Sequence, residues 1–301
     1  MTSLPASTEQ AAPAREENEF TSERHVYEPH KIGLPPIGPY VRELWRRREF
    51  AREMARTNLR AQHFNTVFGQ LWLVLNPLLL ACVYFLLVYI LRGSGSRGVE
   101  FFAHLLAGLF AYYFISDSIR LSVKSVTGGG RLILNTAFPR ALLPLSSVIT
   151  GFLRFLPTLV IYIPVHIIAD LPVDQHLLWL IPLIFLMVVM ASGAGMLVSA
   201  LQVYFRDTSS FLPFFVRIWL YLSPILWAPE HIVGQFSGPI LTLIQLNPMY
   251  SMIGGYTELL QNDAFPPTYM WISAAVWAIA SAVIGFLYFI SREREFAVRV
   301  V

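Results

Sequence analysis

The chain has 301 residues, of which 55% are hydrophobic and 14% are charged, and its mean hydropathy is +0.55. A soluble chain of this length needs a larger charged surface, so the composition excludes a soluble globular protein. The net charge of +3 does not indicate nucleic-acid binding, because the 20 arginines and two lysines cluster beside apolar segments, as expected for a membrane protein. The single cysteine, Cys82, lies inside an apolar run, which excludes internal disulfides and cysteine metal motifs.

Two polar segments precede the first apolar run. Residues 1–38 are rich in Pro, Glu, Ala, Ser and Thr, lack the apolar core of a signal sequence, and are predicted to form a disordered cytoplasmic leader. Residues 39–66 are predicted to form an amphipathic interface helix, with an ordinary solvated helix as the alternative. One face of this helix is apolar and lies opposite arginines and glutamates; it consists of Val41, Leu44, Trp45, Ala51, Ala55 and Leu59. Arg48 falls within this face and must extend its guanidinium toward water.

Residues 67–301 are predicted to form a transmembrane domain with six long apolar runs. These are residues 71–91, 101–123, 141–169, 177–203, 211–228 and 269–290. Most reach the ~20 residues that a helix needs to cross ~30 Å of hydrocarbon, so the predicted fold class is an all-α integral membrane protein with six transmembrane helices. Small residues that let membrane helices pack closely recur at four-residue steps in two runs: Ala191, Gly195 and Ser199, then Ala274, Ala278 and Ala282.

The distribution of basic residues predicts the topology. Eighteen of the 22 lysines and arginines lie on one side of the six-span arrangement, and only Arg92 and Arg97 lie on the other. The positive-inside rule therefore predicts a multi-pass protein of the cytoplasmic (inner) membrane with both termini in the cytoplasm. The segment 239–260 is also apolar, but a seventh span there would place the arginine-rich tail outside. A re-entrant outer hairpin before the last helix is predicted instead.

Motifs for catalysis and cofactor binding are absent from the sequence. A P-loop needs a glycine immediately before its lysine, and neither Lys31 nor Lys124 has one. If ATP drives this protein, a different chain must bind ATP and magnesium and hydrolyse the ATP. No cofactor, metal site or catalytic residue is assigned to this chain. His166 and Asp170, four residues apart, could be a base and its orienting carboxylate, but an interfacial polar cluster explains them equally well.

Charged and aromatic residues within the apolar runs are the candidate substrate path. Intramembrane charges are costly in hydrocarbon, so Arg154 and Arg217, with Asp117 and Arg120 near one end of the second run, either fix packing as pairs or face a path. Aromatic rings can stack on the CH-rich face of a sugar, although a lipid-facing stripe is the alternative. The predicted path residues are Tyr84, Tyr112, Tyr113, Arg154, Phe211, Phe215, Arg217 and Trp219.

Four short motifs follow one another in a characteristic order. They are Phe68–Pro77 (FGQLWLVLNP), Tyr204–Asp207 (YFRD), Ser223–Ile225 (SPI) and Leu246–Tyr250 (LNPMY). Through them, residues 40–301 resemble the membrane-spanning subunits of ABC-type polysaccharide exporters, which move O-antigens, teichoic acids and galactans. The long polar leader and the general similarity favour the actinobacterial branch that exports the galactan of mycobacterial cell walls.

The resemblance implies a homodimer with two nucleotide-binding ATPase subunits and a polyprenyl-diphosphate-linked polysaccharide as cargo. It places contacts with the ATPase at the amphipathic helix and at Gly128, Arg131, Leu134, Phe138 and Arg140. Arg206 and Asp207, in the cytoplasmic connection after the fourth run, are further predicted coupling residues. The resemblance places an outer gate at Pro248, Met249, Tyr250 and Glu258. The apolar cluster between Arg131 and Arg140 suits a short helix seated in a partner's groove, or one packed on the chain's own amphipathic helix. A membrane-embedded transferase for lipid-linked sugars and an ion-driven flippase are the alternative functions.

Overall fold

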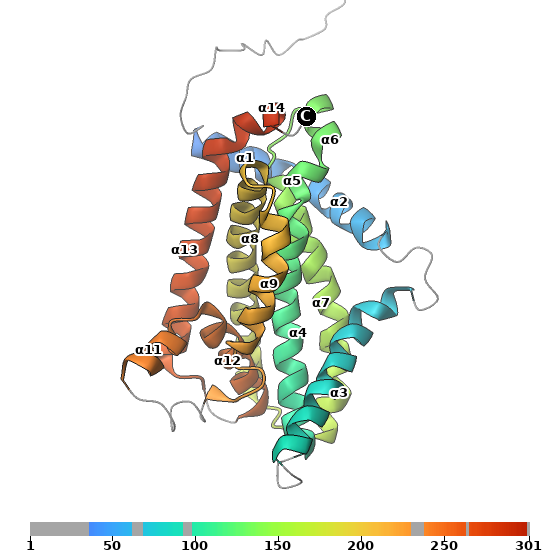
Figure 1. The fold of residues 1–301 in the computed structure, drawn as a ribbon, viewed down its shortest axis with the longest axis vertical. Helices are drawn as coiled ribbons and strands as arrows, with labels where there is room; N and C mark the ends of the chain where they lie inside the picture. Colours follow the sequence, from blue (N-terminus) through green and yellow to red (C-terminus); the bar gives the residue numbers. More distant parts are fainter. Residues whose placement is uncertain (1–35, 62–68, 93–97, 230–237, 263–264, 300–301) are drawn as a thin grey trace, which may run out of the picture. The chain divides into compact units, whose positions relative to one another are not determined.

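The computed structural model describes residues 36–61, 69–92, 98–229, 238–262 and 265–299, and every regular element in these ranges is helical (Figure 1). The α-helices are α1 Ile37–Arg46, α2 Arg48–Ala61, α3 Trp72–Arg92, α4 Gly98–Val123, α5 Ser125–Gly128, α6 Gly130–Asn135, α7 Leu142–Ile168, α8 Leu180–Tyr204, α9 Thr208–Tyr221, α11 Pro239–Gln245, α12 Pro248–Gln261, α13 Thr268–Arg292 and α14 Phe296–Arg299. Short 3-10 turns occupy Gly69–Leu71, Gln175–Trp179 and Glu293–Glu295. Most of the predicted leader and residues 62–66 of the predicted interface helix lie outside the described residues.

Four helical stretches are long and apolar enough to cross a membrane: Gly98–Val123, Leu142–Ile168, Gln175–Tyr204 and Thr268–Arg299. They correspond to the second, third, fourth and sixth predicted runs. The first run lies in α3, whose apolar window is the shorter stretch Val74–Ile90. The fifth run was expected to continue to Ala228, but α9 has 14 residues and ends at Tyr221, because Pro224 disfavours helical conformation just before it. The described chain is therefore an all-helical, multi-pass membrane protein.

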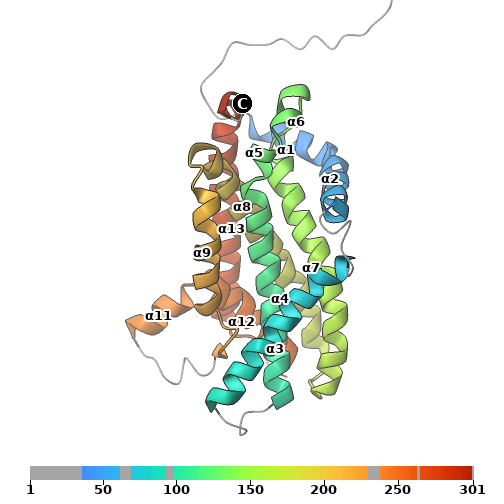
Figure 2. The ribbon, with the colours of Figure 1, turned by 45° about the vertical axis from the view of Figure 1, so that its right-hand side comes forward.

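Helix α4 lies at the centre of the bundle and contacts α3, α7, α8, α9 and α12 (Figures 1 and 2). Its side chains are apolar around most of its circumference, as expected for a helix that is surrounded by other helices. Leu105, Leu106 and Leu109 are completely buried in it. The neighbours that α4 positions, above all α3, α7 and α9, carry most of the predicted path residues.

Helices α8 and α13 approach each other closely at two glycines. A Cβ atom placed on Gly285 would lie 1.9 Å from the carbonyl oxygen of Gly193, so neither position has room for a side chain. The Ser281 hydroxyl donates a hydrogen bond to the Met190 carbonyl oxygen at 2.9 Å beside this contact. Close packing through small residues was predicted for these helices. The contact includes Ala282, which belongs to the predicted steps, and it centres on Gly193 and Gly285, which do not.

The amphipathic segment consists of two helices rather than one. It begins at Ile37 and is interrupted at Arg47, whose guanidinium donates a hydrogen bond to the Ala137 carbonyl oxygen at 2.7 Å. The α2 part of the predicted apolar face turns toward the bundle, because Ala51 and Ala55 are buried against α7, whereas Val41 and Trp45 of α1 are exposed. Helices α1, α2, α5, α6 and α14 lie at one end of the bundle, called here the α14 end, and α11 and α12 lie at the other (Figure 1).

Candidate functional site

A polar cavity of about 560 Å³ lies between α3, α4 and α7. Its polar lining consists of Asn76, Tyr113, Asp117, Arg120, Arg154 and Thr158, and aromatic rings of Trp72, Phe110, Phe114 and Phe155 complete it. We call it the Arg154 pocket. Its volume falls in the range of roughly 300–1,000 Å³ that is typical of ligand sites.

Close packing of α4 on α7 brings the charges of the Arg154 pocket together. A Cβ atom on Gly151 of α7 would lie 2.2 Å from the Ser118 hydroxyl oxygen of α4 and 3.3 Å from its Cα, so the two helices approach closely at this glycine. One residue before Ser118, Asp117 reaches Arg154, and its Oδ2 lies 3.7 Å from the Arg154 Nη1 atom. Both side chains are largely buried, with 32% of Asp117 and 17% of Arg154 exposed.

The Arg154 pocket carries a net positive charge. Arg120 also lines it, and among the residues that the structure describes Arg120 forms no ion pair. Two guanidinium groups therefore face one carboxylate in a partly closed space, where electrostatic interactions are stronger than in water. Guanidinium groups match the geometry of phosphate oxygens, and aromatic walls can stack on sugar rings. This pocket can therefore bind an anionic ligand that also carries a sugar.

The predicted path residues fall into three environments. Tyr113 and Arg154 line the Arg154 pocket, as a path residue would. Tyr112 does not, because it is 1% exposed and its hydroxyl donates a hydrogen bond to the Val216 carbonyl oxygen. In this conformation Tyr112 joins α4 to α9 and the adjacent Tyr113 lines the cavity, so a path role of Tyr112 stays a prediction.

The third environment is an aromatic ladder on α9, in which Phe211 and Phe215 are exposed and Trp219 is half-buried. The ring centroids of Phe211 and Phe215 are 6.3 Å apart, and those of Phe215 and Trp219 are 5.2 Å apart. Arg217 is exposed on the same helix. Tyr84 of α3 lies near Tyr221 at the end of α9. The ladder predicted from the spacing is present, and its exposure to lipid or to cargo stays a prediction.

Two of the four family-like motifs meet at the α11–α12 end. The Asn247 side chain accepts a hydrogen bond from Trp219 Nε1 at 2.8 Å and donates one to the Leu222 carbonyl oxygen at 2.9 Å. Its Oδ1 also caps α12 by accepting from the Met249 N–H at 3.1 Å. Asn247 thus joins the end of α9, just before Ser223–Ile225, to the start of α12.

The residues predicted for an outer gate lie on α12. Met249 and Tyr250 are completely buried, and the Tyr250 and Tyr269 hydroxyl oxygens are 3.4 Å apart. Pro248 and Glu258 are half-buried on the same helix. In this conformation Met249 and Tyr250 anchor α12 in the bundle, and a gating role of these four residues stays a prediction.

The predicted coupling residues divide between exposed and packed positions at the α14 end. Gly128, Arg131, Arg206 and Asp207 are exposed, and Leu134 is 57% exposed. Phe138 instead packs on α2, with its ring centroid 5.3 Å from that of Phe50. The two sequence interpretations therefore apply to different residues: Phe138 contacts the chain's own amphipathic helix, and Leu134 has the exposure that a partner needs.

Arg140 belongs to a polar junction that sequence reasoning did not anticipate. Its backbone N–H donates to Glu293 Oε1 at 2.6 Å, and its guanidinium donates to the Glu293 carbonyl oxygen. The Ala141 N–H donates to the Tyr40 hydroxyl at 3.4 Å. Burial lowers the pKa of Arg140, an effect that Glu293 and Tyr40 oppose, and burial raises the pKa of Tyr40 above its usual range. This junction ties the start of α7 to α1 and to the end of α13.

The enzyme interpretation gains no support from His166 and Asp170. His166 is buried, and its Nε2 atom lies 3.1 Å from the Pro172 carbonyl oxygen. Asp170 is exposed in a left-handed turn with φ of 51°. Within the described ranges no group of three or more His, Cys, Asp or Glu side chains could hold a metal ion.

An all-helical bundle with four stretches long and apolar enough to cross a membrane defines a multi-pass membrane protein, and a charged pocket lies between α3, α4 and α7. Residues 51–260 match the ABC-2 type transporter family, and the chain belongs to this family. The family resemblance expected from the four motifs is confirmed. Membership places the chain among transport components rather than enzymes.

Three curated relatives share one description, "O-antigen export system permease protein RfbA". One from Klebsiella pneumoniae is 30% identical over 241 residues, which cover 80% of this chain and 90% of the relative. Another from the same species is 29% identical over 242 residues, with the same coverage. The relative from Myxococcus xanthus is 24% identical over 261 residues, covering 85% of this chain and 97% of its own length.

Proposed function

We propose that the chain is the permease subunit of an ATP-driven exporter that moves a polyprenyl-diphosphate-linked polysaccharide, galactan or O-antigen-like, across the cytoplasmic membrane. The observation that carries the proposal is the similarity, over 80% of the chain, to an O-antigen export permease. The Arg154 pocket supports it physically. A diphosphate-linked glycan presents phosphate oxygens and sugar faces together, and the pocket offers guanidinium groups and aromatic rings together.

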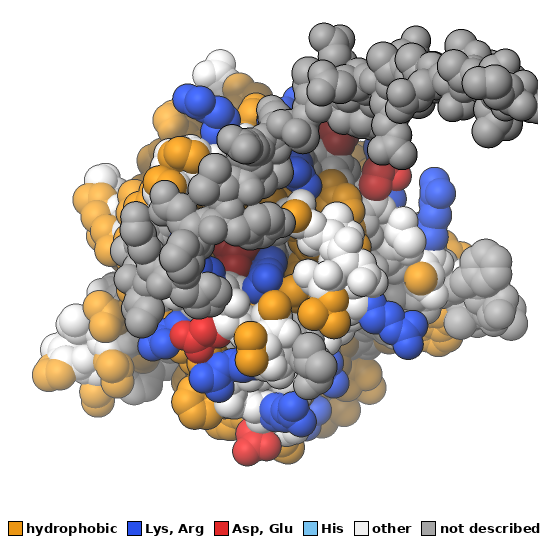
Figure 3. Space-filling model, turned by 90° about the horizontal axis from the view of Figure 1, so that it is seen from above, with side chains coloured by type: hydrophobic (Ala, Val, Ile, Leu, Met, Phe, Trp, Pro, Cys, Tyr) orange, Lys and Arg blue, Asp and Glu red, His pale blue; other side chains and the backbone are white. Residues whose placement is uncertain are grey.

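We further infer an assembly of two copies of this chain with two nucleotide-binding ATPase subunits seated at the α14 end. The six spans of each copy are α3, α4, α7, α8, α9 and α13, and α11 and α12 form the re-entrant outer hairpin. Both termini then lie in the cytoplasm. The basic residues of the α14 end, seen from above in Figure 3, support this orientation, since cytoplasmic loops carry an excess of arginine and lysine.

Cysteine labelling tests the topology. In a Cys82→Ala background, Leu243→Cys in α11 should react with an impermeant maleimide in intact cells, because Leu243 is 72% exposed and belongs to the outer hairpin. Asp207→Cys and Val298→Cys, also at exposed positions, should react only after the membrane is permeabilised. Reaction of Val298→Cys in intact cells would contradict six spans and favour a seventh.

Leu134→Asp tests both the function and the coupling surface. Leu134 is exposed, so the substitution should leave the thermal stability of the chain unchanged. At an ATPase interface it would bury an unpaired charge at a cost of about 3–5 kcal/mol, which weakens binding more than 100-fold. In cells that lack their own copy of the chain, wild type should restore surface polysaccharide and co-purify with the ATPase, and Leu134→Asp should do neither.

Two variants serve as controls for this experiment. Leu243→Asp places the same charge on an exposed leucine at the opposite end and should retain ATPase binding. Phe138→Asp should lower thermal stability, because it disrupts the packing on Phe50. If Leu134→Asp binds the ATPase and exports at the wild-type rate, coupling enters elsewhere, through Arg206 and Asp207. If cells without the chain keep normal surface polysaccharide, the proposed function is wrong.

A further inference from the structure

A second cavity, of about 410 Å³, lies between the amphipathic segment and the membrane-spanning helices α7 and α8. We call it the α1 groove. Val41 and Trp45 of α1 form one wall, and Leu145, Ile149 and Val188 belong to the opposite walls. Apart from Arg48 and Ser192, its lining is apolar or small, which distinguishes it from the Arg154 pocket. The α1 groove shares no lining residue with that pocket.

The apolar face of α1 is left uncovered along this groove. Trp45 is 70% exposed and Val41 is 47% exposed, and α1 has no buried residue. Helix α2 differs, because Ala51 and Ala55 are buried against α7. A tryptophan on a basic amphipathic helix is typical of the boundary between lipid headgroups and acyl chains. The walls supplied by α7 and α8 are apolar surfaces of membrane-spanning helices, so the groove is continuous with the region that lipid acyl chains occupy.

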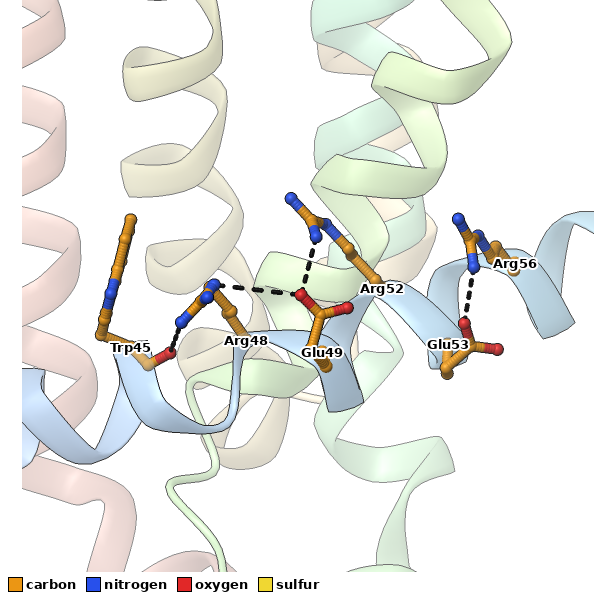
Figure 4. A network of polar contacts seen from close by, with 6 residues as sticks. All are labelled: Trp45, Arg48, Glu49, Arg52, Glu53 and Arg56. Atoms are coloured by element: carbon orange, nitrogen blue, oxygen red, sulfur yellow. Dashed lines mark hydrogen bonds and ion pairs between the residues drawn. The ribbon is translucent and has the colours of Figure 1, made fainter.

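Arg48 is the cation of the α1 groove, and it is less neutralised than its neighbours (Figure 4). Its guanidinium carbon lies 4.9 Å from the centre of the Trp45 ring, its Nη1 atom donates to the Trp45 carbonyl oxygen, and its Nε atom is 3.9 Å from Glu49. Arg52 and Arg56 instead form short ion pairs of 2.7 Å with Glu49 and Glu53. Residues 37–61 contain seven arginines and three glutamates, so the rim is positively charged.

We propose that the α1 groove binds one anionic phospholipid, with an acyl chain between α1 and the α7–α8 surface and the headgroup phosphate at Arg48. Charge complementarity selects this occupant: the interior is apolar, and the one charged lining residue is a cation on a basic helix. A lipid with a net negative charge is favoured over a zwitterionic lipid, because the positive rim attracts net charge and not the phosphate alone. The lipid fixes the seating of α1 against the spans.

Quenching of Trp45 fluorescence by brominated lipids tests the proposal on the full-length chain. Phosphatidylglycerol or phosphatidylcholine with brominated acyl chains is titrated into detergent-solubilised protein, and the signal of Trp45 is the difference between wild type and Trp45→Phe. Phosphatidylglycerol should quench Trp45 at about fivefold lower concentration, as expected for roughly 1 kcal/mol per basic residue. Arg48→Gln should abolish this preference, and Arg48→Lys should keep it.

Matched variants separate a specific site from general attraction to the helix. Arg56→Gln removes the same charge from α2 outside the groove and should keep the preference. Ser192→Leu fills the groove and should weaken quenching by both lipids. Equal quenching of wild type by both lipids, or an equal loss of preference in Arg48→Gln and Arg56→Gln, overturns the proposal. Absence of quenching by either lipid also overturns it, and assigns the groove to protein: a second copy of the chain or the ATPase.

Discussion

Gly285→Ala is expected to destabilise the folded chain by about 1–3 kcal/mol or more, the usual cost of adding a methyl group where there is no space. The added Cβ atom would lie 1.9 Å from the carbonyl oxygen of Gly193 and 2.6 Å from its carbonyl carbon. These are backbone atoms and cannot rotate away as a side chain can. Helices α8 and α13 would have to separate along their whole contact, which includes the hydrogen bond between Ser281 and the Met190 carbonyl.

Thermal unfolding of the purified chain measures this effect. Gly255→Ala is the matched control, since its Cβ atom would meet only the Leu183 side chain at 3.6 Å, an ordinary contact distance. Gly193→Ala should behave like Gly285→Ala, because a Cβ there would lie 2.2 Å from the Ser281 carbonyl group. The double variant should lose less than the sum of the two, since one separation of the helices relieves both clashes. A Gly285→Ala chain as stable as Gly255→Ala would show that the helices are not held this closely.

The sequence could predict which segments are apolar helices, but not where those helices touch. Run length and composition are properties of one segment, and they predicted α4, α7, α8 and α13 to within a few residues. The Gly193–Gly285 contact depends on the rotation and axial register of two helices far apart in the chain, which no single segment encodes. The same holds for the break at Arg47, where the guanidinium donates a hydrogen bond to Ala137 of another segment, a contact that the helical pattern of residues 39–60 does not encode.

For the candidate site, too, the sequence could predict which residues take part but not how they are arranged. Charges within apolar runs pointed to Arg154, Asp117 and Arg120, because such charges are costly unless they serve a purpose. Only the fold shows that Arg154 pairs with Asp117 and that Tyr113, not Tyr112, lines the pocket. Adjacent residues on a helix differ in direction by about 100°, so spacing alone cannot choose between two neighbouring tyrosines. The junction of Arg140 with Glu293 and Tyr40 was not predicted. Glu293 is flanked by Arg292 and Arg294 in the C-terminal tail, and the basic residues of this tail indicated only membrane topology.

Arg154→Gln is expected to reduce export by about 10- to 100-fold, because a charge-assisted hydrogen bond to a phosphate contributes roughly 1.5–3 kcal/mol. The Arg154 pocket holds two cationic side chains and one anionic side chain, so Arg154→Gln removes half of its positive charge. Export of the polysaccharide at equal protein level in the membrane is the measurement. Arg292→Gln is the control, since Arg292 lies exposed at the end of α13, outside the pocket and outside the predicted path.

Asp117→Asn distinguishes cargo binding from packing. If Arg154 serves only to pair with Asp117 across their 3.7 Å separation, either single substitution strands a partly buried charge, and both should lose stability and export alike. Asp117→Asn/Arg154→Gln, which removes both charges, should then recover. If Arg154 binds the cargo, Asp117→Asn leaves the pocket more positive and keeps export, whereas Arg154→Gln and the double variant both lose it. Recovery of export in the double variant would therefore assign Arg154 to packing and remove it from the substrate path.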